Sequence, residues 1–425
     1  MFKSLKLLVN KENKEIRSRI YYTVFALFIF LLGINIAIPG IGKPTAGLDF
    51  LELINVMGGG ALRNYSIFAL GVMPYISASI ITELLQMDIV PYFSELRKQG
   101  PVGRQKINQI NRYLGIAFAF IQGIMYAFLI LGKGKPASDY LYVATILTAG
   151  TAFLLWLGDR MTQKGLGNGI SLLIMAGIVA SLPSMFKSAF NKLVTSGAYG
   201  KEGILLFAVF VIIYLAIVVG VVFVETAERR VKVQYANKTT SSKGAKSFMP
   251  IKINSAGVMP VIFASSLMTL PQIIAQATGK ESVKTFVDNY LTYTKSWGFL
   301  IFIILIILFS YFYTYIQFKP EEFAKNLNEN GGFIPGVRPG KPTETYMANL
   351  LMSLTFGGAI FIAIIAALPI IFNNLSNLPA NITIGGTGLL IVVGVALETY
   401  KQLEGSLVSR NYSRGYSRRK WEILF

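Results

Sequence analysis

Few side chains in this chain could carry out covalent chemistry. The 425 residues include no cysteine and no histidine, which excludes disulfide bonds, Cys/His zinc sites and nucleophiles activated by histidine. The glycine-rich stretch TQKGLGNGIS (162–171) lacks the GxxxxGK[ST] order of a nucleotide-binding loop. No pair of carboxylates is placed to support hydrolysis. We therefore expect no enzyme activity, no catalytic residue, no metal and no cofactor.

The chemistry that remains is non-covalent, and it belongs to arginine and to branched aliphatic side chains. Arg338 lies in PGVRPG, where proline and glycine predict a rigid turn. Arginine can bind a phosphate or a carboxylate through two parallel hydrogen bonds. Val72 and Ile76 are four residues apart and share one face of a helix, and an apolar face can exclude water and ions. Arg338 could also be an ordinary solvated charge in a loop, and Val72 and Ile76 could be ordinary core side chains.

The clearest internal pattern is a repeat. GVMPYISAS (71–79) and GVMPVIFAS (257–265) match at seven of nine positions, and Ile262 has the repeat position of Ile76. Proline is tolerated in the first turn of a helix, and the preceding glycine allows an unusual backbone conformation. Two unrelated membrane helices could begin alike, but the in-register match favours two related halves.

Apolar segments of membrane-spanning length must position these residues. The chain is 53% hydrophobic and 14% charged, and an uncharged run such as 204–224 can cross the roughly 30 Å hydrocarbon core as one helix. Such strong signals favour helices over a β-barrel, and we expect no cleavable signal peptide. The predicted spans are 20–38, 70–87, 113–131, 140–158, 170–186, 203–224, 257–276, 297–318, 347–371 and 386–404.

Positive charge predicts the orientation of these spans. About three of every four of the 40 Lys and Arg residues lie in the terminal segments and in the loops after even-numbered spans, which places both termini in the cytoplasm. Much of the net charge of +19 is then a cytoplasmic surface that could bind anionic lipid or RNA. The two GVMP helices run in opposite directions, which predicts two inverted halves with a path between them.

Six separated blocks carry a family resemblance. They are GGGALRNYSIFALGVMPYISASII (58–81), TQKGLGNGISLLIMAGIVASLP (162–183), FVETAERRVKVQYA (223–236), KINSAGVMPVIFASSL (252–267), GGFIPGVRPGKPTETYM (331–347) and GGTGLLIVVGVALETYKQLE (385–404). In this order they resemble the bacterial SecY family of protein-translocation channels. The resemblance implies an all-α membrane fold with ten transmembrane helices in two inverted-topology halves of five and a re-entrant plug helix after helix 1.

The resemblance also implies the parts of a channel. A ring of aliphatic side chains would close the pore: Val72, Ile76, Ile174, Ile178, Ile262 and Ile391. A plug of about 53–64 would seal it, with Leu53, Ile54, Val56, Met57, Gly58, Gly59, Gly60, Ala61 and Leu62. A lateral gate, through which a signal sequence leaves into lipid, would include Ser79, Gln122, Ser265 and Ser266.

Partners and location follow in the same way. Arg229, Arg230, Lys232 and Arg338 would dock a SecA-type motor ATPase or the ribosome through its rRNA. Small SecE- and SecG-type subunits, signal sequences, nascent polypeptides and anionic lipid are the other expected partners, in the bacterial plasma membrane. The expected division of the chain is an amphipathic segment 1–19, a first half 20–186, an external hinge loop 187–202, a second half 203–404 with cytoplasmic loops 225–256 and 319–346, and a basic tail 405–425.

Three functions remain distinct at this point. A gated polypeptide channel needs an apolar waist and a plug. An inverted-repeat secondary transporter of a small solute usually needs a charged or polar coupling group near the bilayer midplane, and the predicted spans hold no Lys, Asp or Glu there. A passive insertase would have no use for a ring and a plug. The sequence therefore favours the channel.

Overall fold

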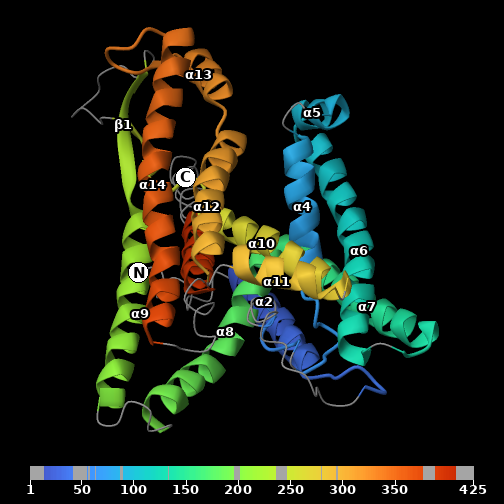
Figure 1. Ribbon diagram of the computed structural model, residues 1–425. Coiled ribbons are helices and arrows are strands. Elements are labelled where there is room, and N and C mark those ends of the chain that lie inside the picture. The colour runs from blue at the N-terminus through green and yellow to red at the C-terminus, as the bar shows by residue number, and fades with distance from the viewer. Residues whose placement is uncertain are drawn as a thin grey trace. The chain divides into compact units, whose positions relative to one another are not determined.

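The computed structural model describes residues 14–41, 55, 58–62, 64–86, 90–132, 134–195, 202–235, 247–278, 280–292, 295–376 and 388–407. Within this part of the chain a helix occupies each of the ten predicted spans: α2 (Lys14–Ile34), α4 (Met73–Leu85), α6 (Pro101–Leu131), α7 (Ala137–Lys164), α8 (Gly169–Phe190), α9 (Glu202–Thr226), α10 (Met259–Thr278), α12 (Ser296–Gln317), α14 (Lys341–Ser376) and the helix 388–407. Seven of the described helices are long and apolar enough to cross a membrane. The predicted all-α membrane fold is confirmed (Figure 1).

Several helix starts differ from the prediction, and α2 and α14 each begin six residues earlier than expected, at Lys14 and Lys341. α4 begins at Met73, because Gly71 has a φ of +56° that ends the preceding turns. α6 begins at Pro101 rather than near residue 113. The polar residues 101–112 continue the helix because Arg, Lys and Gln have good helix propensity, and a hydropathy pattern detects only the apolar part. Short helices flank the long ones: α5 (Pro91–Lys98), α11 (Glu281–Tyr290), α13 (Pro320–Glu329) and the π-helical turn η3 (Asn191–Thr195).

The chain forms two compact units. Unit 1 comprises Met1–Asn191 and Pro379–Phe425, and unit 2 comprises Lys192–Leu378. The helical residues 388–407 belong to unit 1, where Gly388, the first of them that the structure describes, lies beside Ile178 of α8. The proposed division into halves of five helices by membrane topology stays a prediction.

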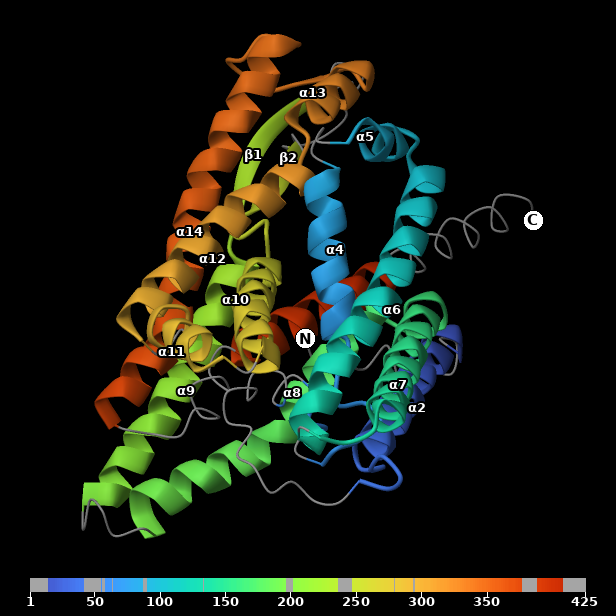
Figure 2. The ribbon, with the colours of Figure 1, turned by 45° about the vertical axis from the view of Figure 1, so that its right-hand side comes forward.

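Small residues let the helices of unit 1 approach closely. α6 packs against both α4 and α7 (Figure 2). A Cβ atom on Gly115 of α6 would lie 3.2 Å from the Cα of Tyr75 on α4, and one on Gly123 would lie 3.1 Å from the carbonyl of Ala144 on α7. Such glycines allow backbone-to-backbone packing in a membrane, where no hydrophobic effect drives helices together.

Unit 2 carries a small sheet at one end of its helices. The strands are β1 (Glu228–Tyr235), β2 (Ser247–Lys252) and β3 (Gly332–Phe333), in the order β2-β1-β3 and antiparallel throughout. β1 lies alongside α14, with α13 close to the same end (Figures 1 and 2). Val231, Val233 and Ile251 of the sheet pack into one buried cluster with Leu327, Ile334, Met347 and Leu351. The sequence pattern did not predict these strands, because their loop was identified only as basic and polar.

Candidate functional site

The two GVMP segments adopt the same local structure. Gly71 has a φ of +56° and Gly257 a φ of +62°, and no atom lies within 4 Å of a Cβ added at either. In each copy the valine that follows accepts the first hydrogen bonds of the helix. The Val72 carbonyl accepts from residues 75 and 76 at 3.1 and 3.2 Å, and the Val258 carbonyl from residues 261 and 262 at 3.2 and 3.3 Å. The sequence repeat is therefore also a structural repeat.

A side chain holds the glycine carbonyl in both copies. In unit 1 the Thr151 hydroxyl of α7 donates to the Gly71 carbonyl at 3.2 Å. In unit 2 the Asn254 amide donates to the Gly257 carbonyl at 3.0 Å and to Glu225 Oε1 at 2.6 Å. Glu225 lies near the end of α9, so this contact ties that helix to the start of α10. The sequence did not single out Thr151 or Asn254 for this role, since the donors are unrelated residue types at unrelated distances from the glycines.

All six predicted ring residues are buried. Exposed fractions are 6% or less for Val72, Ile76, Ile174, Ile178, Ile262 and Ile391. Five of them belong to unit 1 and Ile262 belongs to unit 2. Within unit 1 the structure joins two of the three ring elements, because a Cβ on Gly388 would lie 2.8 Å from Ile178 Cγ2, and Ile391 is one turn further along that helix. That the six form one ring stays a prediction.

The described part of the predicted plug is a compact turn in unit 1. The amide of Gly60 donates to the Asn55 carbonyl at 2.7 Å. Gly59 has a φ of +70°, and its Cβ position lies 2.8 Å from Ile34 Cδ1 and 3.2 Å from the Cα of Gly177. Ala61 and Leu62 are 0% and 1% exposed. The turn thus packs against α8 one residue from Ile178. Leu53, Ile54, Val56 and Met57 lie outside the described residues.

A matched pair of glycines tests this seating of the plug. Gly59→Ala and Gly60→Ala both place a side chain at positive φ, which costs about 1–2 kcal/mol. Only the methyl group at residue 59 would also collide with Ile34 and Gly177. We expect Gly59→Ala to raise the ion leak of the resting protein in proteoliposomes above that of Gly60→Ala. Equal leaks from the two variants would contradict a sealing contact at Gly59.

The four residues predicted at the lateral gate are polar side chains on otherwise apolar helices. Gln122, Ser265 and Ser266 are 6%, 5% and 2% exposed, and Ser266 donates to the Ile262 carbonyl at 2.8 Å. Ser79 donates to Glu83 Oε1 at 3.4 Å on α4. Ser79 and Gln122 belong to unit 1, and the two other serines belong to unit 2. Their participation in one gate stays a prediction.

The predicted basic residues of β1 do not share one face. Val231 and Val233 face the buried cluster, and alternation along a strand puts Arg230 and Lys232 on the opposite, exposed side. Arg229 falls on the same side as the valines, beyond the end of their cluster, and is exposed as well. Arg230 and Lys232 are therefore exposed together on the face of the sheet opposite the buried cluster.

Arg338 lies on a turn that follows β3 and is thereby joined to the same sheet. β3 pairs with β1 through Gln234 and Phe333, and Ile334, 4% exposed, anchors the following turn in the buried cluster. The Thr343 hydroxyl donates to the Arg338 carbonyl at 2.8 Å. Arg338 itself is exposed, and within the described part of the chain its guanidinium has no carboxylate partner. The turn therefore exposes the Arg338 cation next to the sheet.

Comparisons with known proteins agree with this architecture. Residues 66–400 match the SecY family. The protein translocase subunit SecY of Bacillus licheniformis is 46% identical over 418 residues, which cover 95% of this chain and 97% of that protein. A SecY structure described for a plug domain that stabilises the closed translocation channel aligns with a TM-score of 0.68 at 20% identity, covering 93% of each chain. Sec61 in a canine ribosome–channel complex aligns with a TM-score of 0.62 at 18% identity, again over 93% of each chain. The sequence match is extensive enough to conclude that this chain belongs to the SecY family.

Proposed function

We propose that the chain is the central subunit of a gated protein-conducting channel. It moves unfolded secretory polypeptides across the bacterial plasma membrane and releases membrane-protein segments sideways into the lipid. The observation that carries this proposal is the contact of the plug turn with α8, where Gly59 packs on Gly177 beside the buried Ile178. A plug seated next to a ring aliphatic is a seal, and a seal is needed only where a wide path must be closed at rest.

The seal works through the absence of polar groups. Narrow apolar constrictions empty of water and so exclude ions without binding them. Aliphatic side chains at the ring can yield to a passing polypeptide, because they make only dispersion contacts, each about 0.1–0.2 kcal/mol per atom pair. Opening requires the plug to leave its contact with α8.

Reconstitution tests the channel function. Proteoliposomes containing the chain, its small partner subunits and a SecA-type motor should protect a secretory precursor from added protease when ATP is present. A precursor without its signal sequence provides the control for specific entry. If a motor shown to be active with another channel gives no ATP-dependent protection here, the channel function is wrong.

The alternative is a secondary transporter of a small solute, and Glu83 is the residue that would serve it. This carboxylate accepts from Ser79, and its second oxygen is buried without a partner among the described residues. It lies only two residues from the end of α4, away from the midplane where a coupling group is needed. Glu83→Gln should therefore leave precursor translocation unchanged. Loss of a proton-coupled solute flux in this variant, with translocation absent in the parent, would favour the transporter.

Docking of a motor or a ribosome is assigned to the sheet end of unit 2. Arg230, Lys232 and Arg338 are exposed on one subdomain that also contains a packed core. The likeness to Sec61 in a ribosome–channel complex supports the ribosome as one partner. Phosphates of rRNA and carboxylates of a motor protein are both suitable ligands for such cations. SecE- and SecG-type subunits and anionic lipid complete the proposed assembly, with both chain termini in the cytoplasm.

Arg338→Glu should impair translocation driven by a motor or a ribosome, because it reverses the charge at the tip of the docking turn. The fold should be unaffected, since the side chain is exposed and only the backbone carbonyl is bonded to Thr343. Lys341→Glu is the matched control, an equal charge reversal at an exposed residue three positions along. Binding of motor or ribosome and translocation rate are the measurements. Equal losses in both variants would show a general charge effect, and normal translocation in Arg338→Glu would refute the docking role.

A further inference from the structure

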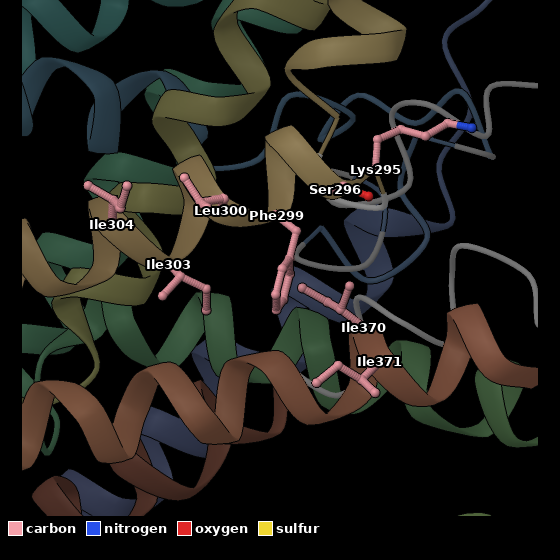
Figure 3. Close-up of a pocket in the computed structure, with 8 residues that line it drawn as sticks. All are labelled: Lys295, Ser296, Phe299, Leu300, Ile303, Ile304, Ile370 and Ile371. Carbon is pink, nitrogen blue, oxygen red and sulfur yellow. The ribbon is translucent and has the colours of Figure 1, made fainter.

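An apolar hollow of about 510 Å³ lies between two membrane-spanning helices of unit 2. Its walls are Phe299, Leu300, Ile303 and Ile304 of α12 and Ile370 and Ile371 of α14. Figure 3 shows Phe299 and Ile303 directed toward α14, with Ile370 of α14 next to Phe299. The volume is within the roughly 300–1,000 Å³ typical of small-molecule sites.

One end of the hollow is polar and cationic. Lys295 and Ser296 line it at the start of α12, and the Lys295 side chain extends beyond the row of apolar side chains (Figure 3). Lys295 is the N-cap residue of α12, and its side chain, which can only donate, adds a full positive charge to the partial positive charge of the helix N-terminus. Within the described residues the Lys295 ammonium has no carboxylate partner.

The polar end of the hollow lies at the level of the lipid headgroups, and its apolar walls lie in the hydrocarbon region. The charge bias places the loop before α12 outside the cytoplasm, so Lys295 lies at the outer surface. Trp297, 62% exposed, is the next aromatic residue along the chain, and tryptophan prefers the level of the lipid headgroups. The apolar walls then extend inward from the headgroup region, where Leu300, Ile304 and Ile371 are about half exposed.

The length of the hollow distinguishes a lipid chain from a protein helix. Residues 295 to 304 span about 14 Å at 1.5 Å per residue, less than half of the roughly 30 Å hydrocarbon core. A partner's transmembrane helix would need a groove along the whole of α12. A single acyl chain needs only a short apolar cleft with a cation at its mouth.

We propose that this hollow binds one anionic phospholipid of the outer leaflet. An acyl chain lies between α12 and α14, and the headgroup phosphate is held by Lys295 and the first turn of α12. A net negative headgroup is favoured, because a zwitterionic lipid brings its own cation next to Lys295. This site goes beyond the channel function and depends only on the membrane location of the two helices.

Trp297 supplies a probe for the headgroup end. The parent for the experiment is the full chain carrying Trp156→Phe and Trp421→Phe, in vesicles of phosphatidylcholine with a small fraction of lipid brominated on its acyl chains. Brominated phosphatidylglycerol should quench Trp297 more strongly than brominated phosphatidylcholine at the same fraction. Lys295→Gln should abolish this preference. Lys284→Gln removes a lysine from the exposed face of α11, outside the hollow, and should preserve it.

A second pair of variants tests the apolar walls. Ile304 and Leu308 lie four residues apart on α12 and are 52% and 54% exposed, but only Ile304 lines the hollow. Ile304→Phe should weaken quenching by brominated phosphatidylglycerol, and Leu308→Phe should not. Inorganic phosphate should not relieve the quenching. Equal quenching of the parent by both brominated lipids would mean ordinary annular lipid. Loss of quenching on adding the small partner subunits would mean that a protein helix fills the hollow. Either result overturns the proposal.

Discussion

Replacing Ile391 with asparagine should make the resting channel leak ions and accept precursors with weakened signal sequences. Ile391 is 3% exposed, one turn along its helix from Gly388, which contacts Ile178. An amide in an apolar constriction binds water and removes the dewetting barrier. Burying it without a partner also costs about 1–3 kcal/mol, which favours a wetter, more open state. Potassium efflux from proteoliposomes and translocation of signal-defective precursors are the measurements.

The same substitution at a buried residue outside the ring distinguishes ion leakage from a general loss of stability. Ile365 of α14 is 4% exposed and is not a ring residue, so Ile365→Asn should lower the melting temperature without raising the leak. Ile76→Asn should behave like Ile391→Asn, because both residues are assigned to the ring. If both ring variants fold, remain impermeable to potassium and still reject precursors with defective signal sequences, these isoleucines do not form the constriction.

Asn254→Leu should change the equilibrium between the closed and open states more than substitution of any other polar residue near the two GVMP turns. Asn254 is 4% exposed and joins Glu225 to the Gly257 carbonyl. A hydrogen bond to a charged group contributes about 1.5–3 kcal/mol. Leucine is similar in size but donates no hydrogen bond. If α10 moves on opening, loss of this contact should shift the equilibrium between closed and open states roughly ten- to hundredfold, at 1.4 kcal/mol per factor of ten.

Two variants provide the comparison. Ser255→Ala removes the exposed hydrogen bond from the neighbouring serine to the Lys252 carbonyl, 2.9 Å long, and should change nothing. Thr151→Val removes the neutral bond to Gly71 in unit 1 and should have a smaller effect, since neutral bonds contribute about 0.5–1.5 kcal/mol. The readouts are thermal unfolding and the signal strength needed for translocation. A lower melting temperature with unchanged signal stringency in Asn254→Leu would leave only a structural role.

Local patterns determined much of this protein before any packing was known. Hydropathy identified ten spans, each of which holds a helix in the described part of the chain, because a backbone inside lipid must satisfy its hydrogen bonds within each segment. The GVMP repeat identified two helix starts, and both have the same positive φ at glycine and proline in the first turn. These features depend on neighbours within a few residues, so the sequence alone was sufficient.

Packing between distant segments decided the rest. Thr151 lies 80 residues along the chain from Gly71, whose carbonyl accepts its hydrogen bond. The sequence around Thr151 and around Gly71 contains no pattern that predicts this contact. The strands of the basic loop form only because Val231, Val233 and Ile251 meet side chains from α13 and α14, and that sheet places Arg229 on a different face from Arg230 and Lys232. Burial beside residues far along the chain has no local signature, so only the tertiary structure could show which polar groups hold the two repeated turns and which cations face outward.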